Sequence, residues 1–79
     1  MQNSKWLVEI RLKDWEAPLR GGARIVSFEE VEACDEFEAR HAGFNQFSDR
    51  ARYEPTMRRK MEGWGITPRN CCAPEAVQI

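Results

Sequence analysis

Residues 5–13 read Lys-Trp-Leu-Val-Glu-Ile-Arg-Leu-Lys and carry the clearest periodic pattern in the chain. Apolar side chains occupy every second position, namely Trp6, Val8, Ile10 and Leu12. The positions between them are charged, apart from Leu7. Since successive side chains of a strand point to opposite faces, this pattern predicts a β-strand with one buried face and one charged face in solvent.

The residues that follow this strand favour a hairpin. Pro18 and Gly21-Gly22 mark residues 14–22 as a connection, and residues 23–26 end in the β-branched pair Ile25-Val26. A connection of this length is too short for a crossover, so the second strand, predicted over 23–26, pairs with the first in antiparallel fashion.

A helix is predicted over residues 28–42. Ser27 and Glu30 match a capping box, and acidic residues crowd the first turns, where the helix dipole favours them. One apolar stripe is formed by Val31, Cys34, Phe37 and His41. Gly43 is the expected stop.

A second helix is predicted over residues 55–63. Pro55 suits the first turn of a helix, and Met57, Met61 and Trp64 follow the i, i+4, i+7 spacing of one buried face. Residues 67–79 contain two prolines and no long periodic segment, so we expect a loosely ordered tail there, with a short terminal strand over residues 77–79 as an alternative.

These elements predict an α+β fold in one small domain, in which the short antiparallel sheet packs against two helices. A chain of 79 residues has room for one domain with a small core. The expected core consists of Trp6, Val8, Ile10, Leu12, Ile25, Val31, Cys34, Phe37, Met61 and Trp64.

Composition gives little direct information about partners. Twelve basic and thirteen acidic side chains leave a net charge of −1. Residues 1–15 lack the apolar run of a secretory signal, and no stretch approaches the length of a membrane span. We therefore expect a cytoplasmic protein that does not engage a membrane.

The sequence contains no recognisable catalytic constellation. His41 is the single histidine, and neither a nucleophile motif nor a phosphate-binding glycine loop occurs. Three cysteines, Cys34, Cys71 and Cys72, lack the spacing of a zinc site or a disulfide framework. We expect a protein that is not an enzyme and that uses no metal or cofactor.

The acidic segment is the sharpest functional feature. Six carboxylates fall within ten residues, between Glu29 and Glu38. On the predicted helix, one exposed face would present Glu29, Glu32, Asp35 and Glu36, and this face is the predicted site for another protein with a basic surface. In size and charge layout, though in no motif, the chain is similar to inhibitors and regulators carried by phages and other mobile elements, such as anti-CRISPR proteins, some of which mimic the charge of nucleic acid.

Three alternatives stay open. The first is a nucleic-acid-binding regulator that uses basic residues of the second helix region, namely Arg52, Arg58, Arg59 and Lys60, with Tyr53 and Trp64 among them. The second is a homo-oligomer in which an acidic surface meets a basic one, or in which a sheet edge pairs with a second copy. The third is a thiol or metal function of Cys71 and Cys72.

Overall fold

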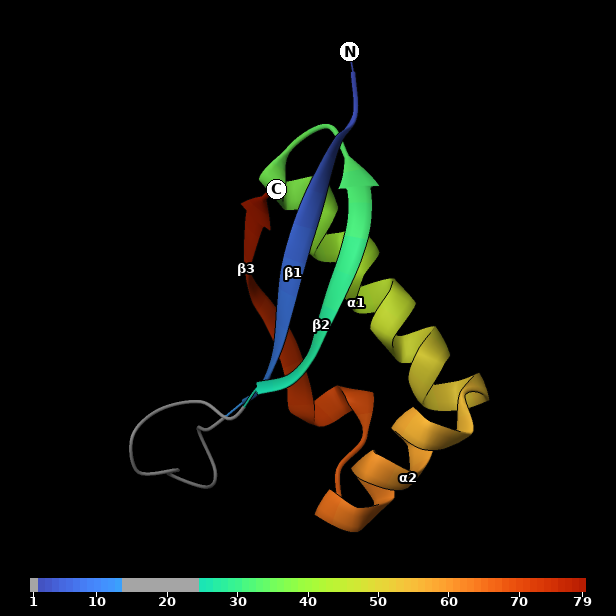
Figure 1. Ribbon diagram of the computed structural model, residues 1–79. Helices are drawn as coiled ribbons and strands as arrows, with labels where there is room; N and C mark the ends of the chain where they lie inside the picture. The colour runs from blue at the N-terminus through green and yellow to red at the C-terminus, as the bar shows by residue number, and fades with distance from the viewer. Residues whose placement is uncertain (1, 14–24) are drawn as a thin grey trace.

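The computed structural model describes residues 2–13 and 25–79, and these residues form two layers (Figure 1). One layer is a three-stranded antiparallel sheet with the strand order β2-β1-β3. The other layer consists of helix α1, which covers one face of the sheet, and helix α2, which closes the core at one end. The predicted α+β class, with an antiparallel sheet and two helices in one small domain, is confirmed.

Strand β1, Ser4–Leu12, is the central strand and matches the predicted alternation. Val8 and Ile10 are completely buried under the helices, whereas Trp6 and Leu12 are partly buried. The indole Nε1 of Trp6 donates a hydrogen bond of 3.0 Å to the carbonyl oxygen of Ala33. The apolar face of β1 therefore organises the core, as its sequence predicts.

Strand β2, Ile25–Ala33, corrects two predictions. The second strand does not end at residue 26, and the first helix does not begin at residue 28. Residues 27–33 pair with β1 in an antiparallel register that places Val31 opposite Trp6 and Glu29 opposite Val8. Of the predicted strand 23–26, residues 23 and 24 lie outside the described residues.

The capping box at Ser27 and Glu30 fails because pairing with β1 overrides this local signal. Ser27 lies within β2, and its hydroxyl donates to the Glu29 carboxylate instead of capping a helix. Alternate residues of β2 reach the helix layer, so the segment satisfies a period of two as well as a helical one. Long-range strand pairing decides between the two readings.

Helix α1, Glu36–Tyr53, begins eight residues later than predicted and is capped by Asp35. The Asp35 Oδ1 atom accepts a hydrogen bond of 2.8 Å from the backbone N–H of Glu38. Gly43 does not stop this helix. It lies buried inside α1 with Ala39 and Phe47, on the face directed at the sheet.

Helix α2, Pro55–Trp64, agrees closely with the prediction. Pro55 occupies the first turn, and Met57 and Met61 are buried. Gly65 ends the helix in the left-handed conformation, with φ of 68°, which glycine adopts without steric cost. Trp64, predicted as a core residue, is instead exposed.

The C-terminal residues form ordered elements in place of the expected loose tail, and the strand considered over residues 77–79 is longer and begins at Cys71. A short 3-10 helix, η1, spans Pro68–Asn70 and leads into β3, Cys71–Gln78. Strand β3 pairs with β1, with Val77 opposite Leu7 and Ala76 opposite Val8. The two prolines are tolerated because one begins η1 and the other, Pro74, lies on an edge strand next to a register shift.

Three further residues of the expected core differ from the prediction. Phe37 is 69% exposed and Ile25 is 42% exposed, while Cys34 is half-buried. The change of element explains Cys34 and Phe37, because β2 extends to Ala33 and Phe37 then lies in the first turn of α1, away from the sheet. Ile25 lies in a strand, as predicted, and is the first residue of β2. Phe47, which the sequence pattern does not single out, is the largest fully buried side chain.

Candidate functional site

The predicted acidic helix face does not exist in the folded chain, because its residues lie on two elements. Glu29 and Glu32 belong to β2, Asp35 caps α1, and Glu36 lies in the first turn of α1. Glu32, Asp35 and Glu36 are exposed, and they lie near the corner where β2 turns into α1. Glu29 is buried and therefore does not share their exposed surface.

Glu29 is 1% exposed and takes part in an internal polar network. Its carboxylate accepts hydrogen bonds from Ser27 Oγ, from Gln46 Nε2 at 2.9 Å and from Arg50 Nη1 at 2.6 Å. A buried carboxylate needs such partners because removing it from water is costly. Glu29 therefore fastens α1 to β2 and is not available to a partner.

Arg50 links this network to the junction between the two helices. Its Nε and Nη2 atoms donate to the carboxylate of Glu54 at 3.0 and 3.2 Å. These hydrogen bonds hold the pKa of Glu54 below its usual value and raise the pKa of Arg50. Arg50 is thus committed to internal ion pairs and is not a free cation.

The opposite end of the molecule carries a set of exposed cations from α1, α2 and η1 (Figure 1), which we call the basic end: Arg52, Arg58, Arg59, Lys60 and Arg69. Among the described residues, no ion pair joins any of these side chains to a carboxylate. Apart from Glu36 and Glu38 in the first turn of α1, the exposed acidic residues on the two helices are Asp49 and Glu62, so the five cations outnumber them. The four basic residues predicted from the sequence lie on α1 and α2, and Arg69, from the same basic C-terminal part of the sequence, lies on η1.

The members of the basic end make different contacts. Arg58 Nη1 donates at 3.5 Å to the backbone oxygen of Arg52, and the guanidinium of Arg52 lies 5.8 Å from the centre of the Tyr53 ring. Lys60 Nζ donates at 2.6 Å to the backbone oxygen of Val26, so its ammonium group also stabilises the edge of β2. The arginines are consequently the better candidates for ligand contact.

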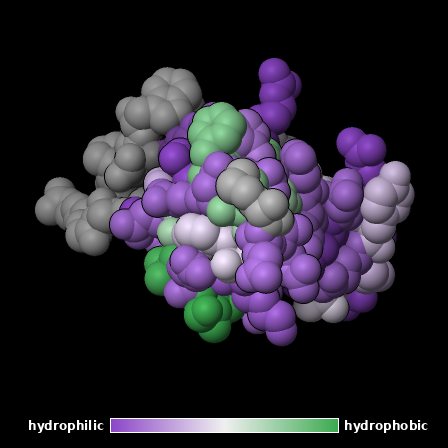
Figure 2. Space-filling model, turned by 90° about the horizontal axis from the view of Figure 1, so that it is seen from above, coloured by the Kyte–Doolittle hydropathy of each residue, from purple (hydrophilic) through white to green (hydrophobic). Residues whose placement is uncertain are grey.

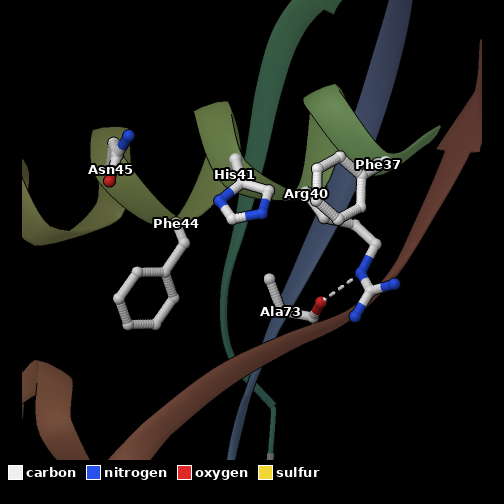
Figure 3. Close-up of a pocket in the computed structure, with 6 residues that line it drawn as sticks. All are labelled: Phe37, Arg40, His41, Phe44, Asn45 and Ala73. Atoms are coloured by element: carbon white, nitrogen blue, oxygen red, sulfur yellow. Dashed lines mark hydrogen bonds between the residues drawn. The ribbon is translucent and has the colours of Figure 1, made fainter. Parts of the chain in front are cut away.

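Two hollows lie along one side of α1. The first has a volume of about 230 Å³, lies between α1 and β3, and is lined by Phe37, Arg40, His41, Phe44, Asn45 and Ala73 (Figure 3). The second, of about 480 Å³, lies where α1 meets η1, and Arg52 and Arg69 are among its lining residues. We call these two hollows together the groove beside α1; one of them contains an aromatic region and the other contains two cations of the basic end.

The aromatic region has a defined geometry. The ring centres of Phe37 and His41 are 4.6 Å apart and tilted by 57°. Phe44 is anchored against the buried Phe47, with 6.0 Å between ring centres. The sequence pattern predicted Phe37 and His41 as members of the buried stripe. The i, i+4, i+7 spacing of residues 37, 41 and 44 does place them on one face of the helix. Only the position of the sheet shows that this face is not the buried one.

The cysteines lie at two separate places: Cys34 lies beside the acidic corner, with its thiol near Asp35 and Glu38, and Cys71 and Cys72 begin β3 directly after η1. Burial raises the pKa of the Cys71 thiol to about 11, so this thiol is protonated at neutral pH. A hydrogen bond to Glu38 raises the pKa of Cys34 as well. Across residues 2–13 and 25–79, no group of three or more histidine, cysteine or acidic side chains is placed to hold a metal ion.

No family model, curated protein or solved structure matches this chain. The functional proposal therefore rests on the described side chains. Neither α1 nor α2 is long and apolar enough to cross a membrane. Seen from the end at which the chain termini lie, the surface is mainly hydrophilic, and its hydrophobic side chains form small separate groups (Figure 2).

Proposed function

We propose that the protein is a non-enzymatic binding module whose basic end contacts the phosphate backbone of nucleic acid. The observation that carries this proposal is the convergence of exposed cations from three elements, none of them in an ion pair with a described carboxylate. Arginines without internal carboxylate partners keep their guanidinium donors for phosphate oxygens, which they bind in a forked geometry.

The overall charge of −1 does not oppose this proposal, because the charges are distributed unevenly. Binding to phosphates depends on the local field near the contact, since charges are screened beyond about 10 Å at moderate ionic strength. The exposed carboxylates Glu32, Asp35 and Glu36 lie near the end of β2 and at the start of α1, whereas Arg52 lies in the last turn of α1. A helix rises about 1.5 Å per residue, so roughly 24 Å of α1 separates Glu36 from Arg52.

The test is fluorescence anisotropy with labelled DNA, single-stranded and duplex, across a salt series. The double variant Arg58→Gln/Arg59→Gln should weaken binding and reduce the slope of log Kd against log salt by about 1.4 to 1.8, because each phosphate contact contributes about 0.7 to 0.9. Lys5→Glu is the control: it changes the net charge by the same two units on the first residues of β1, and it should leave the slope nearly unchanged.

Two results would contradict the proposal. The first is a wild-type protein that binds neither single-stranded nor duplex DNA at low salt. The second is equal loss of affinity in Lys5→Glu and in the double arginine variant, because this would show that total charge, rather than the basic end, governs retention.

A second candidate function is supported by the exposed carboxylates at the β2–α1 corner. Glu32, Asp35 and Glu36 are exposed there, and no described cation forms an ion pair with them. This corner would suit a protein with a basic surface, and a role as a phage-type inhibitor or regulator would follow from such binding. Glu32→Lys/Glu36→Lys should abolish capture of the partner from the source cell, whereas Arg58→Gln/Arg59→Gln should still capture it. Loss of capture in the arginine variant, with capture retained in the glutamate variant, would reject this candidate.

A further inference from the structure

The groove beside α1 has an aromatic surface in one hollow and cations of the basic end in the other. Residues Phe37, His41, Phe44, Ser48 and Arg52 follow spacings of three and four, so they share one face of α1. The face runs from residue 37 to residue 52, or about 22 Å at the helical rise of about 1.5 Å per residue. Beside it lie Ala73 of β3 at one end and Arg69 of η1 at the other.

The aromatic end presents ring surface that the fold does not use. Phe37 is 69% exposed, and its only described ring contact is with His41, itself exposed. Figure 3 shows the side chains of Phe37, His41 and Phe44 along the same side of α1, with Phe44 directed into the space between the helix and β3. An exposed phenyl ring fixed on a helix offers a flat apolar surface to a planar ligand.

A cation is held beside these rings. The Nε atom of Arg40 donates at 2.8 Å to the backbone oxygen of Ala73, which fixes the guanidinium at the edge of the hollow (Figure 3). No described residue bonds to the two terminal nitrogens of Arg40, so they are available to an anion. The amide of Asn45, also in the lining, can donate and accept hydrogen bonds.

We infer that this groove binds single-stranded nucleic acid, with bases stacked on the aromatic end and phosphates held by Arg40 and the basic end. Aromatic side chains along a cationic groove are the combination that single strands require, because their bases are free to stack on protein rings. In a duplex the base faces are covered by neighbouring base pairs, so the aromatic end would gain nothing there. The inference rests on the proposed function and specifies its ligand.

The test compares two exposed phenylalanines. Phe37 lies in the groove, whereas Phe28, 52% exposed, lies in β2, outside both hollows. In anisotropy titrations with a labelled single-stranded oligothymidine, Phe37→Ala should weaken binding by about 5- to 150-fold, the range expected for one lost base stack. Phe28→Ala should bind as the wild type does, and neither variant should alter binding to a duplex of equal length. Thermal melts of both variants verify that the fold is retained.

The outcomes separate this inference from the proposed function. If Arg58→Gln/Arg59→Gln weakens binding and Phe37→Ala does not, base stacking in the groove is refuted, while phosphate binding at the basic end is supported. Equal weakening of duplex and single-strand binding by Phe37→Ala would also refute the stacking. If the wild type binds neither form of DNA, both proposals fall together.

Discussion

Phe47 and Phe37 show how position on one helix sets the role of a side chain. They are ten positions apart in α1, yet Phe47 is fully buried against the sheet and Phe37 is exposed beside the groove. The buried ring is close-packed and the exposed ring is not. The free energy of folding should therefore depend on the first and hardly at all on the second.

Phe47→Ala should destabilise the protein by about 3–5 kcal/mol, because the cavity left in so small a core cannot be refilled. Phe37→Ala should change the free energy of unfolding by less than about 0.5 kcal/mol. Urea titration followed by circular dichroism measures both variants. Similar losses from the two substitutions would mean that Phe37 is packed and that the groove is not open.

The packing of α1 on β1 depends on the absence of a side chain at Gly43. A Cβ atom placed there would lie 2.6 Å from Val8 Cβ, well inside van der Waals contact. Val8 is a completely buried residue of the central strand and cannot move aside without disturbing the sheet. The distance between the helix and the sheet is thus set by one glycine, although glycine weakens a helix interior.

Gly43→Ala should destabilise the fold by about 1–3 kcal/mol, the usual cost of overpacking, despite the better helix propensity of alanine. Gly63→Ala is the matched control in α2, where a Cβ would meet no atom within 4 Å, and it should raise stability by about 0.5–1 kcal/mol. Thermal denaturation distinguishes the two variants by the direction of the shift. Stabilisation by both would show that α1 and β1 are less closely packed than described.

The two sheet edges are partly blocked, which bears on self-association. On β2, backbone oxygens accept hydrogen bonds from the side chains of Lys60 and Gln46. On β3, Arg40 occupies the Ala73 oxygen, and Pro74 has no N–H to offer. These features are common on natural edge strands and oppose the addition of a strand from another chain. A homo-oligomer, if formed, would more readily use the oppositely charged ends.

Completion of the sheet by β3 should be essential for folding. A chain ending at residue 66 loses η1 and β3, leaves β1 without one of its two neighbours, and removes the buried Cys71 and Ala76. We expect it to lack a cooperative thermal transition, because a two-stranded hairpin with one helix layer buries too little apolar area. A chain that lacks only Gln78 and Ile79, both exposed, should still melt cooperatively. A cooperative melt of the chain that ends at residue 66 would show that residues 67–79 are not needed for folding, as a loose tail would not be.

Local sequence patterns were sufficient for part of this fold. The alternation from Trp6 to Leu12 predicts β1, and Pro55 with the methionine spacing predicts α2, because each signal has one physical reading. Helical spacing likewise places Arg58, Arg59 and Lys60 on the polar side of α2, whereas Arg52 lies in a stretch whose sequence has no clear period. The α+β class follows from these elements.

The segment 27–38 could not be read from local patterns, because Ser27, Glu30 and the apolar positions fit a capped helix as well as a strand. Its register with β1, formed between residues 17 to 29 positions apart in the chain, selects the strand and delays the start of α1 until Glu36, after the cap at Asp35. That one shift buries Glu29, disperses the acidic face and leaves Phe37 exposed beside Arg40. Pairing between distant segments is a property of the assembled sheet, and no periodicity within a single segment contains it.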